Sequence, residues 1–398
     1  MMRYVNLLGY AAIPVAFLIH YWLGKDKSWE PVATFIFAAV GVIPLAHLMG
    51  ESTEHLSERT GPTWGGLLNA TFGNAAELII AIIALTRGLT DIVKASLTGS
   101  ILGNLLLVGG LSMVAGGWKR ERQIFNRQAA ETNSGLLALA VAMLVAPAIF
   151  HYTAQNLHDA HIATHEHRIS MACSLVLLLV YGLGLLFTLR THAHIYSPQP
   201  ARSDEDKPGL SGIHRGWSVR RSVAMLLIAA AGIAIVAELL VKSAEQMAHT
   251  LGWNHIFVGV ILLAIIGNAA EHSTAMVLAM RNDMDTAMTI TYQSSLQIAL
   301  FVTPLLIFVS AGFVAAGWSP PTHLNLVFSP MEVVSVMLTV LVVVVIGING
   351  ESNWFEGVLL LAVYVILGIA FFYIPTSAPH GYDGSGALPK TEAIAVPH

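Results

Sequence analysis

The pentapeptide Gly-Asn-Ala-Ala-Glu occurs twice in this chain, at residues 73–77 and 267–271, and each copy lies inside a long apolar stretch. A charged side chain at the centre of a membrane helix costs about 2.5–3.5 kcal/mol on insertion scales. Local packing could accommodate one such glutamate, but the same motif 194 positions later indicates a repeated site. The two motifs are therefore predicted to form the two halves of one cation site in a membrane transporter.

The apolar stretches around the motifs place the whole chain in the membrane class. Apolar residues make up 55% of the chain and charged residues only 11%, against about 25% charged residues in soluble proteins. Because a membrane helix needs about 20 mostly apolar residues, we predict an all-α integral membrane protein with about eleven spans. The predicted spans are residues 5–23, 31–50, 65–86, 94–117, 134–151, 171–190, 222–247, 254–280, 287–316, 326–348 and 355–374.

The composition also excludes some kinds of partner and of covalent cross-link. No basic tract suggests nucleic-acid binding, and the single Cys173 excludes an intramolecular disulfide. Only Arg3 precedes the first apolar stretch and no small-residue cleavage site follows it, so we expect a retained span rather than a signal peptide. The lipid bilayer is the implied partner, and nothing indicates a particular oligomeric state.

A polar segment after the sixth predicted span separates two similar halves. Shifting the chain by 194 positions superposes charged residues as well as the pentapeptide, which background hydrophobicity does not explain. The superposed pairs include Glu51 with Glu245 and Arg87 with Arg281. Five spans is an odd number, so the second half is predicted to insert upside down as an inverted repeat. The predicted parts are an N-terminal transmembrane helix at 1–30, a first inverted repeat at 31–190, a cytoplasmic linker at 191–221, a second inverted repeat at 222–374 and a disordered tail at 375–398.

The distribution of basic residues predicts the orientation. Thirteen of the 20 Lys and Arg residues lie near the N-terminus or in the loops that follow even-numbered spans, with Arg190 at the end of the sixth span included. Cytoplasmic loops carry an excess of Lys and Arg, so the N-terminus and the linker are predicted to be cytoplasmic. With eleven spans, the C-terminus would then lie outside.

Each motif offers oxygen ligands suited to a hard cation. Its asparagine and glutamate are three residues apart and share one face of a helix. The glycine before each asparagine weakens the helix, which can free backbone carbonyls for an ion. Ca²⁺ prefers about six to eight oxygens from carboxylates, amides, carbonyls and water. The predicted cation- and proton-binding residues are Glu77, Glu271, Asn74, Asn268, Gly73 and Gly267, with the first four as metal ligands.

Two carboxylates balance the charge of one divalent cation. When the cation leaves, two buried charges remain close together, and burial and mutual repulsion both favour protonation. The pair is expected to hold either Ca²⁺ or protons and to titrate as a coupled unit. Alternating access would move the site between the two sides. Ca²⁺ is here the transported substrate and protons are the counter-ions, and no cofactor is predicted.

The span after each motif carries further polar residues. We expect them to line the site, with the alternative that they only hydrogen-bond helices to one another. These residues are Ser100, Asn104, Gln293, Ser294, Ser295 and Gln297.

An acidic stripe at the end of the second predicted span includes Glu51 and Glu54, and Glu245 is the repeat counterpart of Glu51. Acidic groups at the opening of a pathway concentrate cations. The alternative is an ordinary solvated helix end.

Two other polar features have structural explanations. Glu238 and Lys242 are four residues apart in the seventh predicted span and are expected to pair with each other rather than to transfer protons. The histidine-rich loop at 151–167 is expected to be an exposed polar segment rather than a metal site.

These motifs resemble the signatures of the Ca²⁺/H⁺ antiporters of the cation/Ca²⁺ exchanger superfamily, in its cation/proton branch. The resemblance implies an eleven-helix fold with Glu77 and Glu271 as the essential acidic pair and with Asn74 and Asn268 helping to form the site. It also implies that the fourth and ninth spans line this site, and that inward movement of protons drives the export of Ca²⁺. The membrane is expected to be a bacterial inner (plasma) membrane. It covers about residues 45–373 and rests on residues 61–79, 267–275, 294–301 and 352–357.

Three other functions can be compared with Ca²⁺/H⁺ antiport: monovalent cation antiport, enzymatic catalysis and passive conduction. A monovalent cation (Na⁺ or K⁺)/proton antiporter could use the same two glutamates. An intramembrane enzyme would need a nucleophile–base set or a His-rich metal triad at midplane depth, and the sequence offers neither, so no enzymatic activity is expected. A passive channel would be an unusual use of an inverted repeat with paired buried acids.

Overall fold

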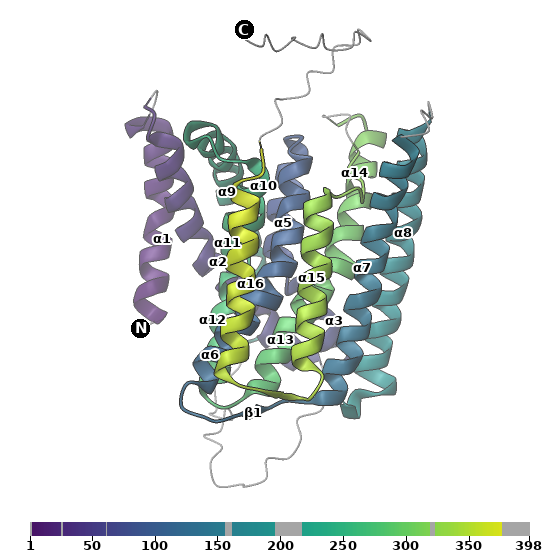
Figure 1. The fold of residues 1–398 in the computed structure, drawn as a ribbon. Helices are drawn as coiled ribbons and strands as arrows, with labels where there is room; N and C mark the ends of the chain where they lie inside the picture. Colours follow the sequence, from purple (N-terminus) through teal and green to yellow (C-terminus); the bar gives the residue numbers. More distant parts are fainter. Residues whose placement is uncertain are drawn as a thin grey trace, which may run out of the picture.

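Helices make up almost the whole chain in the computed structural model (Figure 1). The structure describes residues 2–24, 27–60, 62–155, 161–195, 217–318 and 323–375. Within these residues every predicted apolar stretch is mainly helical. Most of the predicted linker and of the predicted disordered tail, at residues 196–216 and 376–398, lies outside the described residues.

The elements follow the predicted order, with η marking π-helical or 3-10 segments. The first half contains α1 (Met2–Leu18), η1 (Ile19–Leu23), α2 (Glu30–Thr60), α3 (Pro62–Phe72), α4 (Ala75–Thr86), α5 (Thr90–Leu102), η2 (Gly103–Val108), α6 (Gly109–Gly117), β1 (Gln123–Ile124), α7 (Arg127–Gln155), α8 (Ile162–Leu186), η3 (Phe187–Thr191) and η4 (Ala193–Ile195). The second half contains α9 (Val219–Leu251), α10 (His255–Phe257), η5 (Val258–Leu263), α11 (Ala264–Gly267), α12 (Ala269–Met280), α13 (Met284–Gln297), η6 (Ile298–Val302), α14 (Thr303–Ala315), α15 (Pro330–Gly347), β2 (Glu351–Ser352) and α16 (Trp354–Phe372).

Local sequence sets several helix ends. Capping boxes begin α15, where Ser329 pairs with Glu332, and α16, where Asn353 pairs with Glu356. These reciprocal bonds satisfy backbone groups that the first helical turn leaves unpaired. Helix α9 ends at Gly252, whose φ of 66° lies in the left-handed region that glycine tolerates best.

The predicted all-α membrane class is confirmed. Among the described residues, eight helices are long and apolar enough to cross a membrane, and a bent pair over residues 255–280 makes up to nine. The first predicted span, and the third, which is split into α3 and α4, contain only shorter apolar helices. The number of eleven spans therefore stays a prediction.

The loops predicted on one side of the membrane meet at one end of the bundle. Strand β1 pairs antiparallel with β2, with Gln123 opposite Ser352. Asn126, just after β1, donates its side-chain amide to the Ile195 carbonyl at 2.5 Å and its backbone N–H to Asp285 at 2.8 Å. Four segments that follow even-numbered predicted spans thus lie together, around β1 (Figure 1).

The opposite end gathers segments that follow odd-numbered predicted spans. The Lys94 ammonium at the start of α5 donates to Asn325 at 2.5 Å and to the Val327 carbonyl at 2.7 Å. The Leu326 N–H in turn donates to Ser170 of α8 at 3.0 Å. The helical stretches therefore run alternately up and down through the bundle, as the predicted loop order requires.

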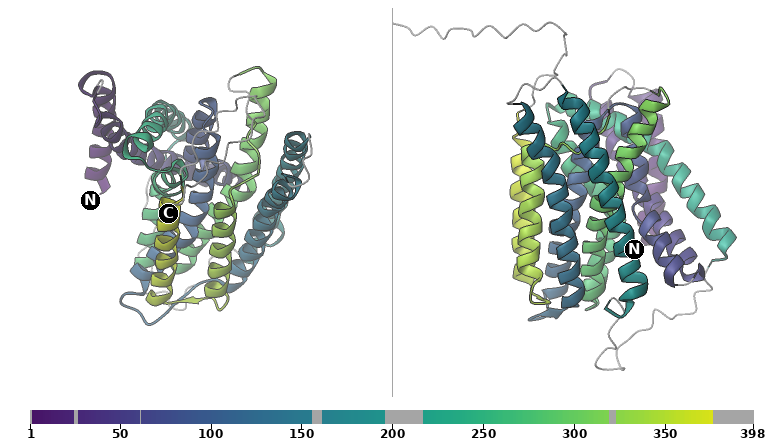
Figure 2. Two further views of the ribbon diagram at one scale, coloured as in Figure 1. Left: turned by 45° about the horizontal axis from the view of Figure 1, so that its top comes forward. Right: turned by 90° about the vertical axis from the view of Figure 1, so that its right-hand side faces the viewer.

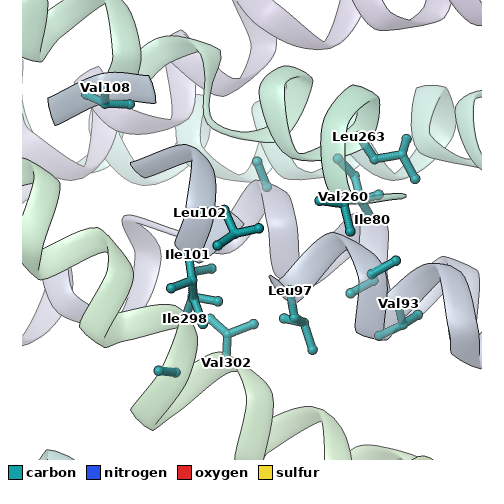
Figure 3. Close-up of a cluster of buried hydrophobic side chains, with 14 of the residues drawn as sticks. Ile80, Val93, Leu97, Ile101, Leu102, Val108, Val260, Leu263, Ile298 and Val302 are labelled. Carbon is teal, nitrogen blue, oxygen red and sulfur yellow. The ribbon is translucent and has the colours of Figure 1, made fainter. Parts of the chain in front are cut away.

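The core mixes side chains from both halves. Ile80, Leu97 and Ile101 of the first half pack with Val260 and Ile298 of the second (Figure 3). Helices α1 and α2 and the other half's α9 lie at one edge of the bundle, with α8 at the other (Figure 2). Neither half has a separate hydrophobic core, so the region between them is fixed by packing from both.

Candidate functional site

Both pentapeptides interrupt a helix. Helix α4 begins after Asn74 (φ −104°, ψ 27°) and α12 begins after Asn268 (φ −95°, ψ 8°). At the second interruption the helix axis turns by 60°. The first break covers Gly73 and Asn74, and the second falls at Asn268, directly after Gly267, so both lie at or next to the glycines where the sequence predicted weakening.

The breaks put each glutamate in the first turn of a helix, Glu77 in α4 and Glu271 in α12. The N-terminus of a helix carries a partial positive charge that stabilises nearby carboxylates. Sequence reasoning missed this placement, because an apolar run with a single glycine does not show where a new helix begins. Asparagine, a residue common at helix starts, was the available signal.

The two motifs face each other. Glu77 is buried and its side chain lies against Gly267 of the second motif, where an added Cβ would be 3.3 Å from Glu77 Cγ and 3.6 Å from its Oε1. The Glu77 and Glu271 carboxylates are close enough to interact electrostatically. Gly267 therefore leaves the space through which the first motif reaches the second.

Each asparagine is held by a helix from the other half. The Asn74 amide donates to Gln297 Oε1 in α13. The Asn268 amide donates to Ser100 Oγ in α5 at 3.0 Å and to the Ala264 carbonyl at 2.9 Å. Because the nitrogens are occupied in this way, the orientation of both side-chain oxygens is fixed.

Three buried oxygens are then left without a hydrogen-bond partner among the described residues: Asn74 Oδ1, Asn268 Oδ1 and Glu271 Oε2. Ser294 of α13 lies beside the Glu271 carboxylate. A buried acceptor without a partner is costly, and oxygens of these types are the ligands that Ca²⁺ prefers. The residues present thus fit a hard cation.

The predicted lining residues divide into two groups. Ser100, Ser294 and Gln297 contact the motifs as described above. The Ser295 hydroxyl donates to the Thr291 carbonyl of its own helix at 3.0 Å, and Gln293 donates to Asn133 of α7 at 3.4 Å. The Gln293 bond joins two helices, which is the alternative given for these residues, whereas the Ser295 bond stays within α13. Asn104 is buried, with no partner for Nδ2 among the described residues.

The difference between Gln297 and Ser295 gives a direct test. Gln297→Leu removes the bond that orients Asn74, and the loss of a buried hydrogen bond of about 1–1.5 kcal/mol corresponds to roughly tenfold weaker half-saturation by Ca²⁺. Transport by reconstituted protein at graded Ca²⁺ measures the effect. Ser295→Ala is the matched control and should behave as wild type. Equal losses in both variants would show that α13 has been disturbed as a whole.

The acidic stripe lies at the end of α2. Within it His55 contacts Glu51 at 3.9 Å and Glu58 at 3.5 Å, and the ring of Trp217 lies 5.1 Å from that of His55. Glu54 is exposed. The stripe is therefore partly solvated and adjoins the start of the second half.

Glu245, the repeat counterpart of Glu51, is half-buried near His255 at the other end of the bundle. The two acids thus lie at opposite ends, as an inverted repeat would place them. A role for either in cation access stays a prediction.

The expected pairing of Glu238 with Lys242 is wrong. Glu238 pairs with Arg87 at 3.0 Å. The Lys242 ammonium lies 3.3 Å from His20, whose other ring nitrogen is 2.6 Å from Glu30. The cause is tertiary packing. Segments packed against α9 bring Arg87 to Glu238 and His20 to Lys242, so the two residues do not pair with each other.

The histidine-rich loop is described only in part, since residues 156–160 lie outside the described residues. His151 pairs with Glu166 at 2.5 Å. Over the described part of the chain, no cluster of three or more His, Cys, Asp or Glu side chains could hold a metal ion. Glu166 is buried and belongs to α8, so this part of the segment is not the exposed loop that the sequence predicted.

Comparisons with known proteins match nearly the whole chain. The family model described as sodium/calcium exchanger protein matches residues 30–190 and 221–373. A Ca²⁺/H⁺ antiporter of Aphanothece halophytica is 42% identical over 373 residues, which cover 91% of this chain and 95% of the relative. The Ca²⁺/H⁺ antiporter ChaA of Bacillus subtilis is 42% identical over 375 residues, covering 94% of this chain and all of the relative.

Two solved exchanger structures also superpose on this chain. The structure of native YfkE superposes with a TM-score of 0.74 at 38% identity, over 93% of this chain and 100% of that one. The H⁺/Ca²⁺ exchanger CAX superposes with a TM-score of 0.62 over 93% of this chain and 92% of that one. At 13% identity the second likeness shows the fold alone.

Proposed function

Because the chain belongs to the sodium/calcium exchanger protein family, a family of transporters rather than enzymes, we propose that it exchanges Ca²⁺ for protons across a membrane. Relatives that are 42% identical over nearly their full length are Ca²⁺/H⁺ antiporters, which supports this substrate pair. The membrane is expected to be a bacterial plasma membrane, with the N-terminus in the cytoplasm.

One observation carries the site assignment: the two motifs meet, and each is held by a helix from the other half. Glu77 lies against Gly267, Asn74 is bound to Gln297, and Asn268 is bound to Ser100. Two halves that share one site in this way can expose it to either side by moving relative to each other.

In the proposed cycle, Glu77 and Glu271 supply the charge and the two Asn Oδ1 atoms complete the binding of Ca²⁺. The carboxylates balance the divalent charge, and both helix N-termini favour the ionised form. When Ca²⁺ leaves, protons replace it, because two buried carboxylates repel each other. The halves then return with protons bound, which couples the two gradients.

Purified protein in liposomes with an imposed pH difference tests the proposal. Addition of Ca²⁺ should dissipate the difference, followed with a pH-sensitive dye, and ⁴⁵Ca²⁺ should move in the opposite direction. Na⁺ and K⁺ at the same ionic strength are the controls. Dissipation by Na⁺ or K⁺ but not by Ca²⁺ would identify a monovalent cation antiporter instead, and Ca²⁺ flux without proton movement would exclude antiport.

The acidic stripe is proposed to attract cations rather than to bind them in the cycle. Glu51→Gln should raise the half-saturating Ca²⁺ concentration by about two- to threefold at low salt, because it removes one charge from a solvated cluster. The effect should shrink at high ionic strength, where surface charges are screened. Complete loss of transport in this variant would place Glu51 in the binding site itself.

A further inference from the structure

A groove runs between α7 and α15, which lie side by side (Figure 1) and expose most of their length on the outside of the bundle. Its volume is about 360 Å³, within the range of small-ligand sites, roughly 300–1,000 Å³. The α7–α15 groove is lined chiefly by Arg127, Glu131, Gly135, Ala138, Val344 and Ile348.

Charges occupy one end of the α7–α15 groove and apolar groups the other. Arg127 is the first residue of α7, next to the end of the bundle marked by β1, and Ala138 lies about 16 Å further along the helix. On α15, Ile348 lies at the same end as Arg127, because the two helices are antiparallel, and Val344 lies one turn deeper. The groove thus descends from the polar boundary of the bilayer into hydrocarbon.

The two charges at the polar end of the groove cancel, because Arg127 and Glu131 form an ion pair. Arg127 Nε lies 2.7 Å from Glu131 Oε1, and both side chains are at least half exposed. The terminal guanidinium nitrogens remain available for a phosphate, and the carboxylate can accept from an ammonium group. An anionic lipid would meet the carboxylate unfavourably, whereas a headgroup with one positive and one negative charge matches both partners.

Gly135 opens the middle of the α7–α15 groove. A Cβ added there would have no neighbour within 4 Å in the described part of the chain. Glycine inside a helix is less favourable than alanine, and no contact with the described residues explains this one. The missing side chain leaves space for a chain that lies along α7.

We propose that the α7–α15 groove binds phosphatidylethanolamine, with its phosphate on Arg127, its ammonium on Glu131 and an acyl chain along Gly135. The primary ammonium distinguishes this lipid from phosphatidylcholine, because a trimethylammonium group cannot donate a hydrogen bond to the carboxylate. The net neutral headgroup distinguishes it from phosphatidylglycerol.

Native mass spectrometry of the full chain, equilibrated with equal amounts of the three lipids carrying identical acyl chains, tests the proposal. Wild type should retain about threefold more phosphatidylethanolamine than either other lipid, the ratio expected for one ion pair at a solvent-exposed site. Glu131→Gln should equalise phosphatidylethanolamine and phosphatidylcholine. Gly135→Leu places a side chain in the groove, where an added Cβ meets no described atom within 4 Å, and should lower retention about fivefold.

Gly182 on α8 supplies the matched control. It is exposed, and an added Cβ has no neighbour within 4 Å among the described residues, so Gly182→Leu should retain lipid as wild type does. Added phosphatidylethanolamine should also raise the melting temperature of wild type and Gly182→Leu but not of Gly135→Leu. Equal retention of the three lipids, or unchanged retention in Gly135→Leu, would overturn the proposal. So would a Gly135→Leu variant that changes only the oligomeric mass, since the groove would then seat a second copy of the chain.

Discussion

Glu77→Gln and Glu271→Gln are each expected to abolish Ca²⁺/H⁺ exchange while the protein still inserts and folds. Either variant leaves one carboxylate to balance a divalent cation and removes one proton acceptor from the pair. A fall of at least about a hundredfold in initial rate, or about 2.7 kcal/mol, is expected. The measurement is proton flux driven by Ca²⁺ in liposomes at matched protein content.

Glu121→Gln serves as the matched control, because Glu121 is exposed in the loop between α6 and β1. It should transport as wild type does. Gel filtration and melting curves should show that both motif variants remain folded, since the amide keeps the size of the carboxyl group. Exchange close to the wild-type rate in either motif variant would end the assignment of the acidic pair.

Among substitutions outside the motifs that add one methyl group, Gly99→Ala is expected to lower protein stability most. Gly99 of α5 lies so close to the backbone of Val260 in η5 that an added Cβ would overlap it. Backbone cannot rotate away as a flexible side chain can, so the helices must separate. Overpacking costs about 1–3 kcal/mol of stability. The next residue, Ser100, accepts a hydrogen bond from Asn268, so a shift of α5 also disturbs the second motif. We expect a lower melting temperature together with weakened transport.

Gly103→Ala, one turn further along the same helical stretch, is the control for Gly99→Ala. An added Cβ at Gly103 has no neighbour within 4 Å among the described residues. Gly103 is buried, but the added methyl group meets no atom, so overpacking does not apply and this variant should melt within a degree or two of wild type. Equal melting temperatures for the two variants would show that α5 and η5 do not pack as tightly as described.

Much of the fold followed from patterns that hydrophobic periodicity and repetition make visible. The apolar stretches predicted the helices because a bilayer leaves few alternatives to helix. The repeated pentapeptide predicted that Glu77 and Glu271 belong together. The structure puts Glu77 against Gly267 of the second motif, and the pairing of the two carboxylates in one site stays a proposal. The helices depend on local composition and the link between the motifs depends on exact repetition. Both can be read from a single sequence.

Partners chosen by tertiary packing could not be predicted in the same way. Asn74 and Gln297 are 223 positions apart, and no periodicity connects them. Glu238 has a basic residue one turn away, yet it pairs with Arg87 of α4. Ser294 and Ser295 are adjacent and chemically identical. Ser294 lies beside Glu271 whereas the Ser295 hydroxyl bonds its own helix, since successive side chains on a helix are about 100° apart.

The contacts that cross between the halves also constrain how a nascent chain must mature. Glu77 is translated early, whereas Gly267 and Gln297, against which it and Asn74 rest, emerge only after another two hundred residues or so have been made. During that interval the amino-terminal half has to persist in the bilayer with an acidic group that has not yet met its counterpart. Contacts so distant in sequence form slowly and late, so completion of the ion site coincides with the end of biogenesis rather than with the insertion of any one helix.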